Sequence, residues 1–70
     1  MAPSPILDFI AYTVKDDTRI RLATYPDFEQ AERRIQFLKK AEIVMTNQAL
    51  KGETRYHYEH GHLIHISNQK

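Results

Sequence analysis

The stretch that decides the fold is Arg55-Tyr56-His57-Tyr58-Glu59-His60-Gly61-His62-Leu63-Ile64-His65-Ile66-Ser67. It contains all four histidines of the chain, two of the four tyrosines and one of the two glycines. Aromatic and β-branched residues favour extended backbone, and a central Gly marks a turn. The stretch therefore predicts a β-hairpin.

Two registers are open to this hairpin. A two-residue turn at His60-Gly61 pairs Glu59 with His62, and it mixes polar and apolar residues on both faces. A three-residue loop over 59–61 places Gly61 at the left-handed position that such loops require. Because a half-buried sheet needs one apolar face, we expect the three-residue loop. It gathers on one face Tyr56, Tyr58, His62, Ile64 and Ile66, and on the other Arg55, His57, Leu63 and His65.

Residues 8–14 and 19–24 predict a second hairpin, because both segments are rich in β-branched and aromatic residues. We expect a three-residue loop over 16–18, although Thr18 is neither Gly nor Asn, the residues that tolerate a positive φ. The predicted core face holds Ile10, Tyr12, Val14, Ile20 and Leu22. The predicted outer face holds Phe9, Ala11, Thr13, Lys15, Arg19, Arg21 and Ala23.

Between the hairpins, the spacing of apolar residues predicts a helix from Asp27 to Lys51, with Thr24 as a cap before Pro26. The apolar stripe consists of Phe28, Ala31, Ile35, Leu38, Ala41, Met45 and Ala49. An alternative is that residues 42–46 form a strand, because Ile43 and Val44 prefer extended backbone.

These elements predict an α+β fold in which two β-hairpins form an antiparallel sheet with one helix packed across one face, in the order ββαββ. We expect a flexible lead over 1–5, a single domain over 6–67 and a short tail over 68–70. No signal peptide or membrane span is expected. The lack of cysteine fits a reducing compartment, so we expect a cytoplasmic protein.

The formal net charge is only +1, which is not the profile of a dedicated nucleic-acid-binding protein. The expected registers nevertheless gather basic residues on the solvent face: Lys15, Arg19, Arg21, Arg55, His57 and His65. Three interpretations compete, namely a solvated surface, a docking surface for an acidic protein patch, and a surface for nucleic-acid phosphates. Base stacking is disfavoured because the register buries the tyrosines.

Neither metal binding nor catalysis is expected. The histidines are spaced like metal ligands, but alternation along a strand sends them to different faces, so we expect no metal and no cofactor. A response to pH stays open, since histidines titrate near neutrality. The chain has no thiol and no glycine-rich loop, and Ser4 and Ser67 lie near its ends. We therefore expect a protein that is not an enzyme.

The chain resembles no family through specific motifs, although its size and layout are similar to those of small regulatory and inhibitor proteins. We expect a non-enzymatic binding module that masks or modulates a larger partner protein; nucleic-acid binding through the basic face is the alternative. A helix of this length would overhang its own sheet. We therefore expect a homodimer with an interface formed by Phe37, Ile43, Val44 and Leu50.

Overall fold

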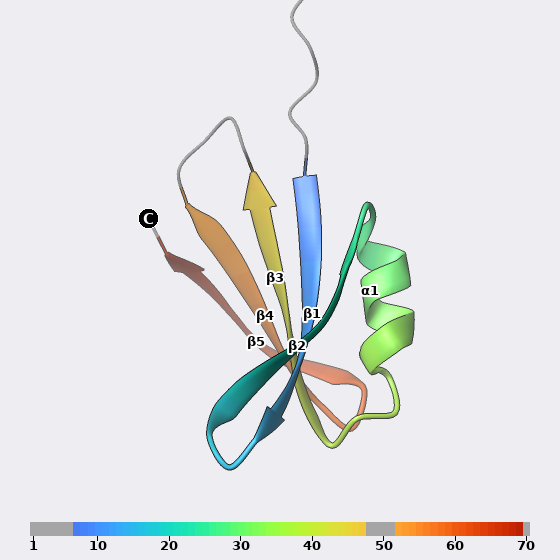
Figure 1. The fold of residues 1–70 in the computed structure, drawn as a ribbon. Helices are drawn as coiled ribbons and strands as arrows, with labels where there is room; N and C mark the ends of the chain where they lie inside the picture. The colour runs from blue at the N-terminus through green and yellow to red at the C-terminus, as the bar shows by residue number, and fades with distance from the viewer. Residues whose placement is uncertain (1–6, 48–51, 70) are drawn as a thin grey trace, which may run out of the picture.

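A computed structural model describes residues 7–47 and 52–69 of the chain (Figure 1). In chain order the elements are β1 (Leu7–Lys15), β2 (Thr18–Tyr25), α1 (Phe28–Ile35), β3 (Lys40–Asn47), β4 (Glu53–Glu59) and β5 (His62–Gln69). All neighbouring strands are antiparallel, and the sheet order is β2-β1-β3-β4-β5. The expected α+β fold, with an antiparallel sheet and one helix, is confirmed. The order along the chain is ββαβββ rather than ββαββ.

The expected limits of the domain meet the structure only in part. The flexible lead over 1–5 lies outside the described residues, and so does residue 70. Strand β5 continues to Gln69, so residues 68 and 69 of the expected tail belong to the sheet.

The prediction of one helix from Asp27 to Lys51 is wrong, and the alternative prediction of a strand over 42–46 is confirmed. Helix α1 ends at Ile35, and the chain returns to the sheet as β3, between β1 and β4. Ile43 and Val44 are both buried although they point to opposite faces of the sheet, which is the burial pattern of a central strand. Their β-branched side chains pack well on a pleated surface, and this preference overrides the helical spacing.

The N-cap of α1 is Asp27 rather than Thr24. Its backbone is extended, and its carboxylate accepts hydrogen bonds from the backbone N–H of Gln30 at 2.8 Å and from the Gln30 side chain at 2.7 Å. These hydrogen bonds, the backbone one first, lower the pKa of Asp27. The cap fixes the start of the helix, which is separated from the end of β2 by two residues.

Both hairpins turn through two residues, so the three-residue loops are wrong. Positive φ angles occur at Asp16 (50°) and Asp17 (62°), and at His60 (51°) and Gly61 (80°). Two consecutive positive φ angles are typical of the turn whose twist matches a hairpin, and Asp tolerates this region better than most residues. Each hairpin then contains one bulge, which leaves an extra residue, Leu22 in β2 and Ile64 in β5.

As a result, the residues of β1 that face the core are those predicted to face outward. Phe9 and Ala11 are buried in the core, whereas Tyr12 lies on the side of the sheet away from α1, because a shift by one residue turns every side chain over. Ile20, Ile64 and Ile66 are also more exposed than expected. The buried cluster consists of Phe9, Ala11, Ala31, Ile35, Ala41, Ile43 and Tyr58.

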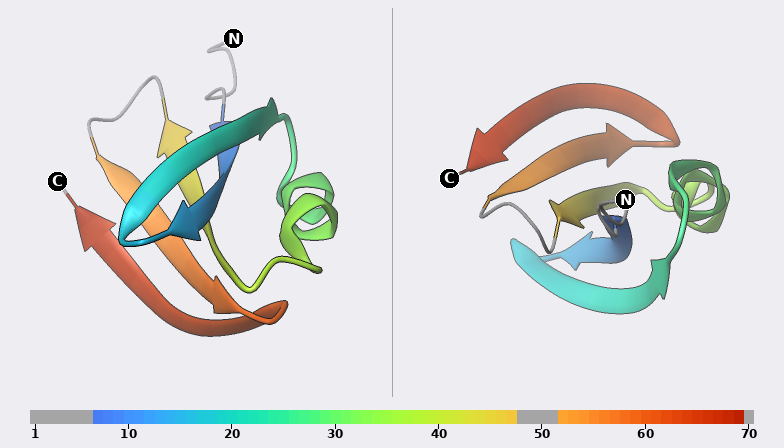
Figure 2. Two further views of the ribbon diagram at one scale, coloured as in Figure 1. Left: turned by 60° about the horizontal axis from the view of Figure 1, so that its bottom comes forward. Right: turned by 90° about the horizontal axis from the view of Figure 1, so that it is seen from above.

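Helix α1 lies against β1, β2 and β3 (Figure 2). The Tyr58 hydroxyl ties it to β4 by donating a hydrogen bond to Glu32 Oε2 at 2.9 Å. Burial, followed by this contact with the Glu32 carboxylate, raises the pKa of Tyr58, so the hydroxyl keeps its proton and remains a donor. The β4–β5 turn lies against the segment that follows the helix. There the backbone N–H of His60 donates a hydrogen bond to the backbone carbonyl oxygen of Lys39 at 3.0 Å.

The contact of this turn with the helix end makes Gly61 difficult to replace. A Cβ atom at position 61 would lie 2.6 Å from Gln36 O, and the φ of +80° also disfavours other residues. We expect Gly61→Ala to lower the free energy of unfolding by about 1–3 kcal/mol, measured by urea denaturation. His60→Gly, which relaxes the neighbouring left-handed residue, is the control and should be neutral or stabilising. Equal stability of Gly61→Ala and the parent would contradict this contact.

Candidate functional site

We call the side of the sheet that faces away from α1 the open face. Cross-strand pairing aligns its side chains in rows, and the central row crosses all five strands: Arg21, Tyr12, Glu42, His57 and His65. A second row runs beside it: Thr24, Ile10, Val44, Arg55 and Ser67. The open face therefore has a polar centre, in contrast to the apolar face beneath α1.

Glu42 is the centre of this row. Its side chain is 13% exposed, with Arg19 Nη1 at 3.6 Å from Oε1 and His57 Nδ1 at 3.7 Å from Oε2. Both separations are ion-pair distances beyond hydrogen-bond range, and Oε1 has no hydrogen-bond partner. The Arg19 guanidinium also lies over the ring of Tyr12, at 5.1 Å from its centroid. A largely buried carboxylate thus depends on nearby positive charge.

His57 links Glu42 to the edge of the sheet. Its Nε2 is 3.2 Å from Ser67 Oγ, and its ring centroid is 5.4 Å from that of His65. The order serine, histidine, carboxylate is that of a nucleophilic relay. The 3.7 Å separation from Glu42 is too long for a hydrogen bond, however, and the adjoining hollow of about 140 Å³ is not lined by Ser67. The arrangement is therefore that of a polar ladder rather than a formed catalytic site.

The histidines do not converge. His57 and His65 share the open face, as expected, and His62 pairs with Glu59 and is exposed rather than turned inward. His60 lies in the turn. Among residues 7–47 and 52–69, no three His, Asp or Glu side chains are arranged to hold a metal ion.

The structure brings together five of the six basic residues selected from the sequence. Arg19, Arg21, Arg55, His57 and His65 lie on the open face, but carboxylates are interleaved with them; Glu53 Oε2, for example, is 3.0 Å from Arg55 Nε. By strand alternation, the described charges of this face are the basic Arg19, Arg21, Lys40 and Arg55 and the acidic Asp8, Glu42, Glu53 and Glu59. The surface is mixed in charge rather than uniformly positive.

Lys15 lies apart from this group, in what we call the lysine hollow. This hollow of about 470 Å³ lies between the β1–β2 hairpin end and the segment that leads from α1 into β3. Its lining is apolar at Val14 and Leu38 and positive at the rim, and it consists of Thr13, Val14, Lys15, Asp16, Leu38, Lys39 and Lys40. The volume is in the range of small ligand or side-chain pockets.

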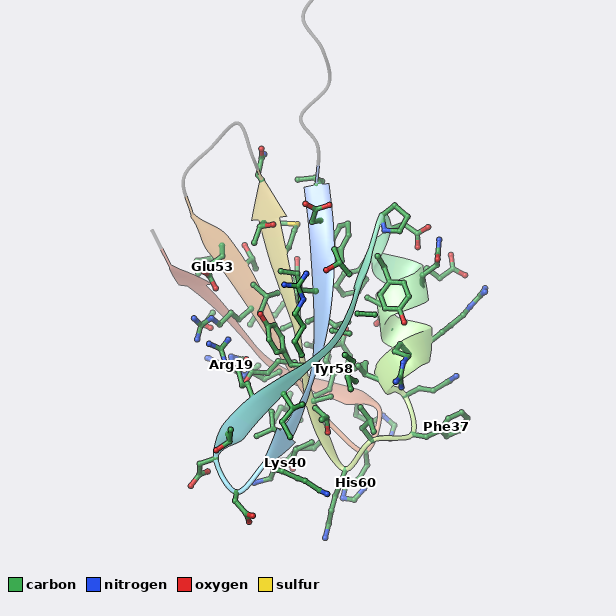
Figure 3. All side chains as sticks on the ribbon, in the orientation of Figure 1. Arg19, Phe37, Lys40, Glu53, Tyr58 and His60 are labelled. Carbon is green, nitrogen blue, oxygen red and sulfur yellow. The ribbon has the colours of Figure 1, made fainter. Side chains whose placement is uncertain are left out.

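Phe37 directly precedes Leu38, a lining residue of the lysine hollow, and is 91% exposed. Figure 3 shows its ring pointing away from the body of the protein. The backbone around it is held on both sides, since Leu38 N–H donates to Ile35 O at 3.0 Å and the β4–β5 turn contacts Gln36 and Lys39. Sequence reasoning placed this segment inside a helix and so missed the hollow, although Lys39-Lys40 directly after Phe37-Leu38 was a visible signal.

The dimer interface expected from the sequence is wrong in its main contacts. Ile43 and Val44 are buried within the sheet of one chain, so they are not available to a second copy. Leu50 lies outside the described residues. Of the three residues that the structure describes, only Phe37 is exposed.

No family model matches the chain, and comparison with curated proteins and with solved structures found no match either. None of the helical segments in the described part of the chain has the length and apolar character needed to cross a bilayer.

The ion pair at Glu42 predicts a measurable coupling. Arg19→Met should lower the free energy of unfolding by about 1–3 kcal/mol, because it leaves a largely buried carboxylate without its cation. Glu42→Gln should suppress most of that loss in the double variant, as a double-mutant cycle in urea will show. Arg33→Met removes an exposed pair with Glu29 and should cost no more than about 0.5 kcal/mol. Additive losses at Arg19 and Glu42 would contradict the coupling.

Proposed function

We propose that the chain is a small non-enzymatic binding module that masks or modulates a larger partner protein, as a regulator or inhibitor. The observation that carries the proposal is the exposed ring of Phe37, which directly precedes Leu38 of the lysine hollow in the chain. Burying a phenylalanine side chain stabilises by about 1.5–3 kcal/mol, and this protein leaves Phe37 in water. Aromatic anchors with a polar rim are typical of the residues that dominate protein interfaces.

The way the loop is held strengthens this interpretation. Residues that lose little freedom on binding give more of their contact energy to affinity. The backbone on both sides of Phe37 is already fixed by hydrogen bonds to Ile35 and from His60. A partner therefore meets an aromatic anchor whose backbone is held in place before contact.

The charges around the hollow indicate the partner's chemistry. Lys15, Lys39 and Lys40 face a single carboxylate, that of Asp16, within the lining. We propose that the partner inserts an apolar side chain flanked by acidic residues, and accepts Phe37 in a pocket of its own. Val14 and Lys40 also line the smaller hollow on the open face. The docking surface then continues onto the open face, where it includes Arg19, Arg21, Arg55, His57 and His65.

Nucleic-acid binding through the same basic residues is the second candidate. Three arginines on one face favour it. Two observations favour protein instead: each of Arg19 and Arg55 is paired with a carboxylate, and Tyr12 lies against Arg19 rather than free for base stacking. A cytoplasmic location remains our expectation and rests on the lack of cysteine.

The anchor is tested by placing a photo-reactive benzoylphenylalanine at position 37 and irradiating the protein in extract of its source cells. We expect a discrete protein adduct that is lost when Lys39 and Lys40 are both changed to Glu. The same probe at Glu29, an exposed position on α1, is the matched control. An adduct that disappears on nuclease treatment would support nucleic acid instead, and equal labelling from both positions would overturn the anchor.

The absence of catalysis is tested at the polar ladder. We expect the parent protein, Ser67→Ala and Glu42→Gln to hydrolyse p-nitrophenyl acetate equally, at the rate of their exposed imidazoles. A positioned acid–base pair contributes at least about 10²-fold. A loss of that size in both variants, with the fold intact by circular dichroism, would show that the protein is an enzyme.

A further inference from the structure

Strand β5 forms one edge of the sheet, and β2 forms the other. In the part of the chain that the structure describes, no strand pairs with the outer side of β5. The backbone N–H and C=O groups on that side are a template for another strand. Natural edges are commonly protected by charged residues, proline or a covering segment.

A bulge can also protect an edge, and β5 contains one at Ile64, but within the described residues it has no charged residue, proline or covering segment. Its residues, 62–69, include no Asp, Glu, Lys, Arg or Pro. Three apolar side chains on it remain in water, with exposures of 45% at Leu63, 57% at Ile64 and 48% at Ile66. Helix α1 leaves them uncovered, because it packs on β1, β2 and β3 (Figure 2).

We propose that β5 pairs with β5 of a second copy of this chain, antiparallel and around a two-fold axis, to form a continuous sheet of two five-stranded halves. The charge distribution selects this occupant. Two β5 strands meet without any formal charge, whereas two β2 strands would bring Arg19 and Arg21 of both copies together. Pairing of β5 with β2 would be head-to-tail and would generate a ring or an open fibre, whereas β5 with β5 closes as a dimer.

The pairing gives the exposed isoleucines a partner. Ile66 lies on the same side of the sheet as α1, and across the new strand pair it would contact apolar residues of the copy's β5. The edge amides would be satisfied at the same time. The two copies thereby remove from water the apolar surface that one short helix cannot cover.

The symmetry also has a consequence for the open face. A two-fold axis between antiparallel strands of one sheet stands perpendicular to the sheet, so both open faces point the same way. The central row of each copy ends at His65 on β5, so a pairing centred near this residue would bring the two rows together across the axis. The proposed docking surface would be doubled, but the pairing itself does not depend on that function.

The test is the mass of the 70-residue chain in solution, measured by sedimentation equilibrium across micromolar concentrations. We expect a species of twice the 8.3 kDa chain mass. Ile66→Lys should shift it to the monomer. Ile20→Lys is the matched control, since Ile20 is an isoleucine of the other edge strand, on the same side of the sheet and 47% exposed. It should leave the dimer unchanged.

Hydrogen exchange separates loss of pairing from loss of folding. In the parent, amides of β5 should become more protected as concentration rises, while those of β2 should not change. Ile66→Lys should lose this dependence and keep the circular dichroism spectrum of the parent. A parent that is monomeric throughout, or dissociation by Ile20→Lys with no effect of Ile66→Lys, would overturn the proposal.

Discussion

Alternation of side chains between the two faces of a strand is the constraint on which the rest of this structure depends. The turns at 16–17 and 60–61 set which residues pair, and one residue of shift would move every apolar side chain to the other face. The bulges at Leu22 and Ile64 change the alternation once in each hairpin. As a result Ala23 lies on the side of α1 while Arg21 lies on the open face, and Leu63 lies on the side of α1 while His65 lies on the open face.

Strand β3 carries this constraint through the centre of the sheet. It pairs with β1 and β4, so its side chains occupy the centre of both faces of the sheet. On the side of α1 the central residue is Ile43, which is fully buried in the core. On the open face it is Glu42, and the desolvation of its carboxylate is offset by the nearby Arg19 guanidinium. The open face is therefore polar and ordered at its centre.

The sequence was sufficient for the fold class and for part of the candidate surface. Both hairpins exist where β-branched and aromatic residues cluster, and Arg55, His57 and His65 share a face as expected. The face of β1 was missed because positive φ angles at Asp16 and Asp17 have no glycine to signal them. The helix was extended too far because Leu38, Ala41 and Met45 fit a helical stripe, while Ala41, Ile43 and Met45 fit an alternating strand equally well. Strand pairing in the folded protein decided between the two. Because the helix ends at Ile35, Phe37 lies outside it and is exposed.

The size of the helix explains why this chain leaves apolar surface uncovered. An eight-residue helix is about 12 Å long and about 10 Å across. Five strands about 4.8 Å apart span about 19 Å from first to last. One helix of this length therefore covers two or three strands, and α1 lies against β1, β2 and β3. The apolar residues of β5 and the ring of Phe37 fall outside its reach. These uncovered apolar surfaces are the reason for both proposals, a second copy at the edge of the sheet and a partner at the lysine hollow.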